Sequence, residues 1–265
     1  MAPLEYSGTI AFMDKYKLKT AFQKSFLGLI WRMEVDTRSG LMAVETRDAA
    51  SGKPHFSVFR YSSGNTCLAE FPYGDRNWTL AGIINGLLLL RAYGAQSPDS
   101  AGIACINATD GEIMWEQFNY TLLAIQGDTL LARHRNFSAG YEEHLQVTDG
   151  TPLRQQPTQQ QDQPSGEPLR IPHPYTGKYP DFLAHYAIHG DLHYCKAGSY
   201  EVWAFHETAG PGYRIRLAVS HTSGLIDERI VITGLTKMIP ELFFMIGSQI
   251  FLIGDNKQEI VSYLL

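Results

Sequence analysis

The stretch that decides the fold is WTLAGIINGLLLL, residues 78–90. Two strongly apolar runs, residues 78–84 and 87–90, flank the dipeptide Asn85-Gly86. Asn-Gly is the strongest short hairpin signal, because both central residues of a type I′ turn need a positive φ. The stretch therefore predicts a tight hairpin between two buried strands.

Similar apolar hairpins recur along the chain, and a more polar turn follows most of them. The apolar hairpins are centred on Gly40, Gly86, Gly127, Gly198 and Gly247, with Gly190 as a rival centre for the fourth. After the first four, a polar turn ends 23 to 26 residues downstream, at Gly64, Gly111, Gly150 and Gly224. The spacing indicates a repeating unit of four antiparallel strands in about 40–45 residues, the size of a propeller blade.

These repeats predict an all-β protein, a β-propeller of five four-stranded antiparallel blades. Six blades remain an alternative if Gly190 begins a hairpin of its own. An isolated apolar run at residues 7–13 is expected to pair with the last hairpin and close the ring, because closure removes an exposed edge. Residues 155–191 begin with a Gln-, Pro- and Ser-rich segment, which predicts an inserted loop within one domain spanning residues 1–265.

Two segments resemble known families. Residues 103–116, IACINATDGEIMWE, are similar to the repeat of quinoprotein-like (PQQ-type) β-propellers: Gly111 and Trp115 match, whereas Asn107 and Asp110 depart from the pattern. That resemblance implies a blade architecture and implies nothing about a cofactor. The segments 30–32 and 45–48 resemble an uncharacterised bacterial family of about this length, which implies a shared fold without an assigned activity.

Composition restricts the partners. The net charge is −5 and no basic stripe is present, so a nucleic-acid or anionic-membrane partner is not expected. No run approaches the roughly 18 apolar residues of a membrane span. Three cysteines far apart in the sequence favour a reduced, cytoplasmic environment. We expect no cofactor, and an unidentified protein or small molecule as the partner.

A cluster of imidazoles is the first candidate site. His185, His189 and His193 are spaced four apart, so a helix or a strand would align them. Imidazoles on one face could bind a transition metal. The alternative is that they form hydrogen bonds on the surface, and Gly190 is expected to separate His193 from the other two.

A second candidate site combines charged and aromatic residues. Arg32, Glu45 and Arg47 lie on adjoining predicted strands, where they would either line a ligand site or pair across the hairpin. Tyr179 and Asp181, in the inserted loop, are further candidates for ligand binding. The four tryptophans, by contrast, are expected to lie in the blade core.

No sequence motif for a catalytic nucleophile or a phosphate-binding loop is present. The sequence therefore favours a non-enzymatic propeller module that binds a protein or small ligand. One alternative is a metal-assisted hydrolase or lyase using His and Asp residues of the region 173–195. Another is a carbohydrate binder.

Overall fold

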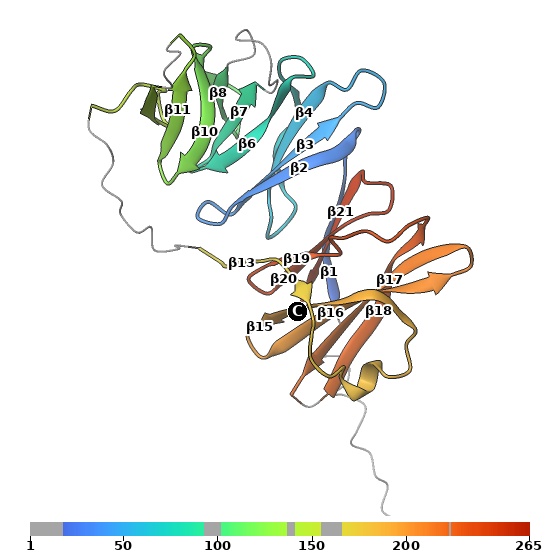
Figure 1. Ribbon diagram of the computed structural model, residues 1–265. Helices are drawn as coiled ribbons and strands as arrows, with labels where there is room; N and C mark the ends of the chain where they lie inside the picture. The colour runs from blue at the N-terminus through green and yellow to red at the C-terminus, as the bar shows by residue number, and fades with distance from the viewer. Residues whose placement is uncertain (1–17, 93–101, 137–140, 155–165, 223) are drawn as a thin grey trace, which may run out of the picture. The chain divides into compact units, whose positions relative to one another are not determined.

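The computed structural model describes residues 18–92, 102–136, 141–154, 166–222 and 224–265. These residues form five β-sheets, and their only helical segment is a short 3₁₀ helix, η3 (Asp181–Leu183) (Figure 1). The all-β prediction is confirmed. No helix in these ranges is long and apolar enough to span a membrane.

The described residues fall into two compact units. The first unit comprises Lys24–Pro168 and Asn256–Glu259, and the second comprises the other described residues. The single domain predicted over residues 1–265 stays a prediction.

The first unit contains three sheets that follow one another in sequence (Figure 1). Two are the expected four-stranded antiparallel meanders. The third has three strands, extended by an isolated bridge between Leu145 and Pro152. The strands are β2 (Leu29–Asp36), β3 (Leu41–Arg47), β4 (Pro54–Arg60), β5 (Thr66–Pro72); β6 (Trp78–Ile84), β7 (Leu87–Ala92), β8 (Ile103–Asn107), β9 (Ile113–Gln117); β10 (Tyr120–Gln126), β11 (Thr129–His134), β12 (Glu142–Gln146).

The decisive stretch forms the predicted hairpin, β6–β7. Asn85 has φ 50° and Gly86 φ 77°, as a type I′ turn requires. Leu88 and Leu90 pack against the sheet β2–β5, whereas Leu89 packs against the sheet β10–β12. Because the middle sheet is buried on both faces, β7 is a continuous apolar run rather than an alternating one.

Each of the three sheets carries a β-bulge in its first strand. The ladder skips one residue between Ile30 and Arg32 in β2, between Leu80 and Gly82 in β6, and between Leu122 and Ala124 in β10. The extra residues are Trp31, Ala81 and Leu123. This shared irregularity marks the three sheets as repeats of one unit.

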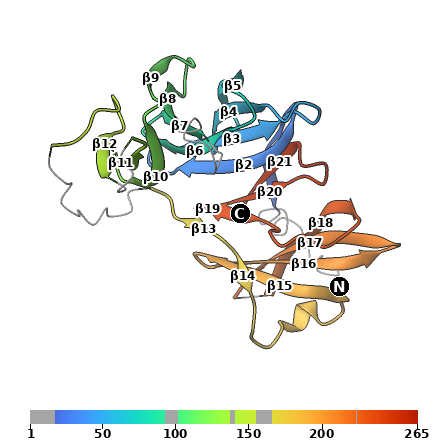
Figure 2. The same cartoon turned by 45° about the horizontal axis from the view of Figure 1, so that its top comes forward.

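The second unit contains two sheets, apart from the end residues Lys24 and Ser25 of β1 and Glu259 of β21, which are assigned to the first unit (Figure 2). Both sheets have five strands. The larger one, which has the longer strands, is ordered β14-β15-β16-β17-β18, and the smaller one is ordered β1-β21-β20-β19-β13. Their strands are β14 (His173–Pro174), β15 (Ile188–Ala197), β16 (Tyr200–Ala209), β17 (Gly212–His221), β18 (Gly224–Leu235); β1 (Lys19–Ser25), β13 (Leu169–Arg170), β19 (Phe244–Ile246), β20 (Gln249–Ile253), β21 (Glu259–Leu264).

The loop before β15 covers one face of the larger sheet. Phe182, Leu183 and Tyr186 pack with Trp203 and Phe205 of β16. Residues 155–165 of the predicted inserted loop lie outside the described residues. The described part, up to β15, is the loop that bears β13, β14 and η3.

Two further expectations concern how the predicted ring closes and how many blades it has. The predicted closing strand, residues 7–13, lies outside the described residues, but β1 shares a sheet with β21, the last strand. Gly190 is not a hairpin centre in the structure, because β15 runs through it and turns into β16 at Gly198; the number of blades stays a prediction. No sheet of the described ranges closes on itself, and the closed five-bladed ring is not confirmed.

Candidate functional site

A pocket of about 610 Å³ lies in the first unit, where the sheets β2–β5 and β6–β9 meet. Among the described residues, seven line it, of which four are arginines and none is acidic. The lining residues are Trp31, Arg32, Arg47, Gly52, Arg76, Thr79 and Arg91. The pocket therefore contains two of the predicted ligand-binding residues, Arg32 and Arg47.

Arg47 is held rigidly by a buried carboxylate. Its Nε and Nη2 donate to Glu45 Oε1 at 2.6 and 2.5 Å, and Glu45 is fully buried. The other oxygen of Glu45 accepts from Thr79 Oγ1 and from the Leu80 amide, both at 2.7 Å. Since Thr79 and Leu80 belong to β6, the ion pair ties the first sheet to the second.

The Arg47 guanidinium also donates to three backbone carbonyls, two in loops and one at the start of β6. Nη1 donates to Gly52 O at 3.0 Å and to Arg76 O at 2.8 Å, and Nη2 donates to Trp78 O at 2.6 Å. With these bonds and its ion pair, Arg47 shapes the pocket wall and has little capacity left for a ligand.

Arg32 pairs along its own strand. Its Nε and Nη2 both lie 2.9 Å from Glu34 Oε1, and both side chains are partly exposed. The predicted pairing across the hairpin is therefore replaced by two pairs within strands, Arg32 with Glu34 and Arg47 with Glu45.

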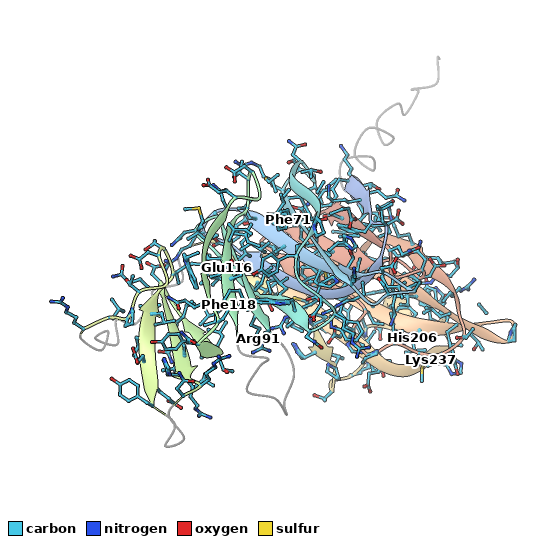
Figure 3. The ribbon with its side chains drawn as sticks, turned by 90° about the horizontal axis from the view of Figure 1, so that it is seen from above. Phe71, Arg91, Glu116, Phe118, His206 and Lys237 are labelled. Atoms are coloured by element: carbon cyan, nitrogen blue, oxygen red, sulfur yellow. The ribbon has the colours of Figure 1, made fainter. Side chains whose placement is uncertain are left out.

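An arginine equivalent to Arg47 occurs in each of the three sheets of the first unit. Counted outward from the bulge, Arg47 of β3, Arg91 of β7 and Arg133 of β11 occupy the same ladder position. Arg133 donates to Glu142 on the neighbouring strand at 2.8 Å. Arg91, labelled in Figure 3, lies one residue before the end of β7 and has no ion-pair or hydrogen-bond partner within the described ranges.

The pocket consequently carries uncompensated positive charge. Glu45 neutralises Arg47 and Glu34 neutralises Arg32, whereas the side chains of Arg76 and Arg91 pair with no carboxylate of the described chain. An arginine guanidinium suits a carboxylate or phosphate, which it binds through two parallel hydrogen bonds. The chemistry of the pocket is that of an anion site.

Trp31 corrects the expectation that all four tryptophans lie in the core. Its side chain is 69% exposed, because it is the bulged residue of β2 and a bulge redirects the side chain it carries. The Arg47 guanidinium lies 5.7 Å from the centre of its ring, in a cation–π contact. Trp203, by comparison, is buried, with its Nε1 donating to Ser220 Oγ.

Tyr179 and Asp181, the other predicted ligand residues, belong to the second unit. Both are exposed, and Asp181 lies 3.6 Å from Lys178 Nζ. The structure therefore divides the five predicted ligand residues between the two compact units.

The three histidines of the predicted metal site have separate neighbours. His185 contacts the ring of Tyr186, His189 Nε2 lies 2.7 Å from Thr208 Oγ1, and an irregular stretch of β15 separates His189 from His193. Burial lowers the pKa of His193. Within the described ranges, no three His, Cys, Asp or Glu side chains form a group that could hold a metal. The free cysteines Cys67, Cys105 and Cys195 are equally dispersed.

Arg76, Arg91 and the exposed position of Trp31 were missed by sequence reasoning. Arg91 directly follows the apolar run of β7, at an offset from the hairpin glycine close to those of Arg47 and Arg133. That repeated offset, of five to seven residues, is the signal that could have identified it. Nothing in the sequence marks Arg76, which reaches the pocket from a loop.

The comparisons with known proteins give a family match for part of the chain. Residues 35–115 match a family described as a domain of unknown function, DUF4905. The matched segment includes Arg47, Arg76 and Arg91 and excludes Trp31 and Arg32. Comparison with curated proteins gave no match.

Two solved structures resemble the chain weakly. The crystal structure of BamB from Moraxella catarrhalis aligns over 89% of this chain and 85% of that chain, at 11% identity and a TM-score of 0.34. Raptor from Chaetomium thermophilum aligns over 96% of this chain and 29% of that chain, at 8% identity and a TM-score of 0.28. At such TM-scores neither structure carries an argument about fold or function. What the comparisons show for this chain is a partial match to a domain of unknown function.

Proposed function

We propose that this chain is a non-enzymatic binding module whose ligand is an anion held in the arginine pocket of the first unit. The observation that carries the proposal is that Arg76 and Arg91 line a pocket whose described lining includes no acidic residue, and that neither has an ion-pair partner in the described chain. Arg91 is half-buried, and an unpaired guanidinium in such a recess attracts anions more strongly than an exposed one such as that of Arg76, because the local dielectric constant is lower.

The residues around the pocket support binding rather than catalysis. None of the seven described lining residues is a His, Cys, Asp or Glu, so this part of the lining presents no general base and no thiol nucleophile. Its volume, about 610 Å³, falls within the range of about 300–1,000 Å³ of small-molecule sites. A carboxylate or phosphate compound of modest size suits these dimensions.

The proposed scaffold is a propeller of five blades, one for each sheet. Support comes from the three bulged repeats of the first unit and from the sheet that joins β1 to β21, the pairing of chain ends by which propellers close. Deleting residues 1–25 should lower the melting temperature by several degrees, whereas deleting residues 1–17, which spares β1, should not. Equal melting temperatures for the two truncated proteins would refute closure. The cytoplasmic location and the absence of nucleic-acid and membrane partners stay predictions.

The anion site is tested by calorimetric titration with pyrophosphate and with glutarate. We expect at least one of them to bind, more weakly as the salt concentration rises, because screening weakens ionic attraction. Arg91→Gln combined with Arg76→Gln should reduce the affinity at least about tenfold, equivalent to about 1.4 kcal/mol.

The matched control is Arg60→Gln, which removes an exposed arginine of β4 that does not line the pocket. Its affinity should equal that of the parent. Failure of the parent to bind either anion would refute the proposal. Unchanged binding by the double variant would refute it as well.

A further inference from the structure

Trp31 is the most unusual residue of the pocket. An exposed fraction of 69% for a tryptophan leaves a large apolar surface in water, which is unfavourable by tens of cal/mol for each Å². The bulge maintains this exposure, because the extra residue in β2 cannot take its place in the alternation of the strand. The backbone therefore presents the indole to solvent.

The indole is also pre-positioned. The Arg47 guanidinium lies near its ring, and that guanidinium is itself held by Glu45 and by three backbone carbonyls. Within the described ranges, Trp31 has no aromatic partner. A ring supported by a fixed group and otherwise exposed offers a stacking surface at little cost in conformational entropy.

The rest of the pocket supplies the charge. Arg76 and Arg91 line the same space as Trp31 and provide the unpaired guanidinium groups. A simple inorganic anion would satisfy the arginines but would leave the indole exposed and much of the 610 Å³ unfilled. A ligand that matches both features has a flat ring joined to an anionic group.

From this juxtaposition, and resting on the anion site proposed above, we infer that the ligand is a planar aromatic anion. Its ring stacks on Trp31, and its carboxylate or phosphate group pairs with Arg91 and Arg76. An aryl carboxylate and a nucleoside phosphate share this chemistry, and the two arms of the experiment distinguish them.

The experiment compares probes of equal charge that differ by a ring. In the first arm, isophthalate is compared with glutarate, a flexible dicarboxylate. In the second, adenosine monophosphate is compared with ribose 5-phosphate. In at least one arm the ring-bearing probe should bind about tenfold more tightly, a factor at the upper end for one aromatic contact. The arm that shows this difference identifies the ligand class, an aryl carboxylate or a nucleoside phosphate.

Two variants assign the advantage of the ring to Trp31. Trp31→Ala should abolish it while leaving the affinity of the ringless probe unchanged, and Trp31→Phe should retain most of it. Leu27→Ala is the control, because Leu27 is an apolar side chain of the same segment, 84% exposed, that does not line the pocket.

The outcomes separate this inference from the proposed function. If ringless and ring-bearing probes bind equally and Arg91→Gln weakens both, the anion site stands and the planar ligand is refuted. If Trp31→Ala preserves the advantage of the ring, stacking on Trp31 is refuted. If no probe binds to the parent, both proposals fall.

Discussion

The sheets β2–β5 and β6–β9 share one plan but use the same arginine in opposite ways. In both, the first strand is bulged, and the second strand places an arginine one ladder step outside the bulge. Two residues before that arginine, the first sheet has Glu45 and the second has Leu89, and both side chains are fully buried. The buried residue thus decides whether the arginine has a carboxylate partner.

With Glu45 beside it, Arg47 is neutralised and serves to connect the loops of the two sheets. Leu89 packs against the sheet β10–β12 and offers Arg91 no charge. The comparison teaches that a repeated residue can be structural in one repeat and available for a ligand in the next, through a change two positions away.

The largest expected effect comes from giving the first sheet the leucine of the second. Glu45→Leu should lower the free energy of unfolding by about 3–5 kcal/mol, because it leaves the charge of Arg47 without its buried partner. It also removes the acceptor for Thr79 Oγ1 and the Leu80 amide. Urea denaturation measures the loss. Glu34→Leu, at a partly exposed pair, should lose no more than about 1 kcal/mol, and equal losses would show that burial does not distinguish the pairs.

The hairpin turns of the two sheets provide an intermediate effect. Gly40 and Gly86 have φ 72° and 77°, and a Cβ at either would meet no atom within 4 Å. Gly40→Val and Gly86→Val should each lower the free energy of unfolding by about 1–2 kcal/mol. The cause is the left-handed backbone conformation, which a β-branched residue adopts only with strain, and not a steric clash. Ala50→Val, at an exposed turn residue without a positive φ, is the control. An unchanged denaturation midpoint for Gly86→Val would contradict the type I′ turn.

The smallest expected changes in stability come from substituting the equivalent arginines of the second and third sheets, Arg91 and Arg133. Arg133→Gln should cost at most about 1 kcal/mol, since its pair with Glu142 is exposed to solvent, and the loss should shrink at high salt. Arg91→Gln should change stability by less than about 0.5 kcal/mol, because it breaks no pair in the described chain. Chemical denaturation at low and high salt measures both. A large loss for Arg91→Gln would assign it a structural role.

The strands of the first unit were predictable because their signals are local. The turns at Gly40, Gly86 and Gly127 lie between consecutive apolar runs, and the β6–β7 hairpin follows from Asn85-Gly86 alone. Pairing of the chain ends depends on distant segments: β1 joins the sheet of β21, and the predicted closing strand, residues 7–13, lies outside the described residues.

The site was only partly predictable, for physical reasons. Arg32, Glu45 and Arg47 were found because oppositely charged residues at alternate positions of adjoining strands are visible in the sequence. A bulge adds one residue to a strand, and neither Trp31 nor its two neighbours is a glycine or proline that would mark it in the sequence. Arg76 comes from a loop and Arg91 from another sheet, so only the packing of the first unit unites them with Trp31.

The bulge in β2 has an evolutionary consequence. Residues on both sides of Trp31 are paired in the ladder, so the strand contains one residue that the pairing does not use. Removing that codon would restore regular pairing, and substituting it would leave the neighbouring pairs unchanged. The position can therefore acquire, exchange or lose a recognition residue independently of the selection that maintains the sheet.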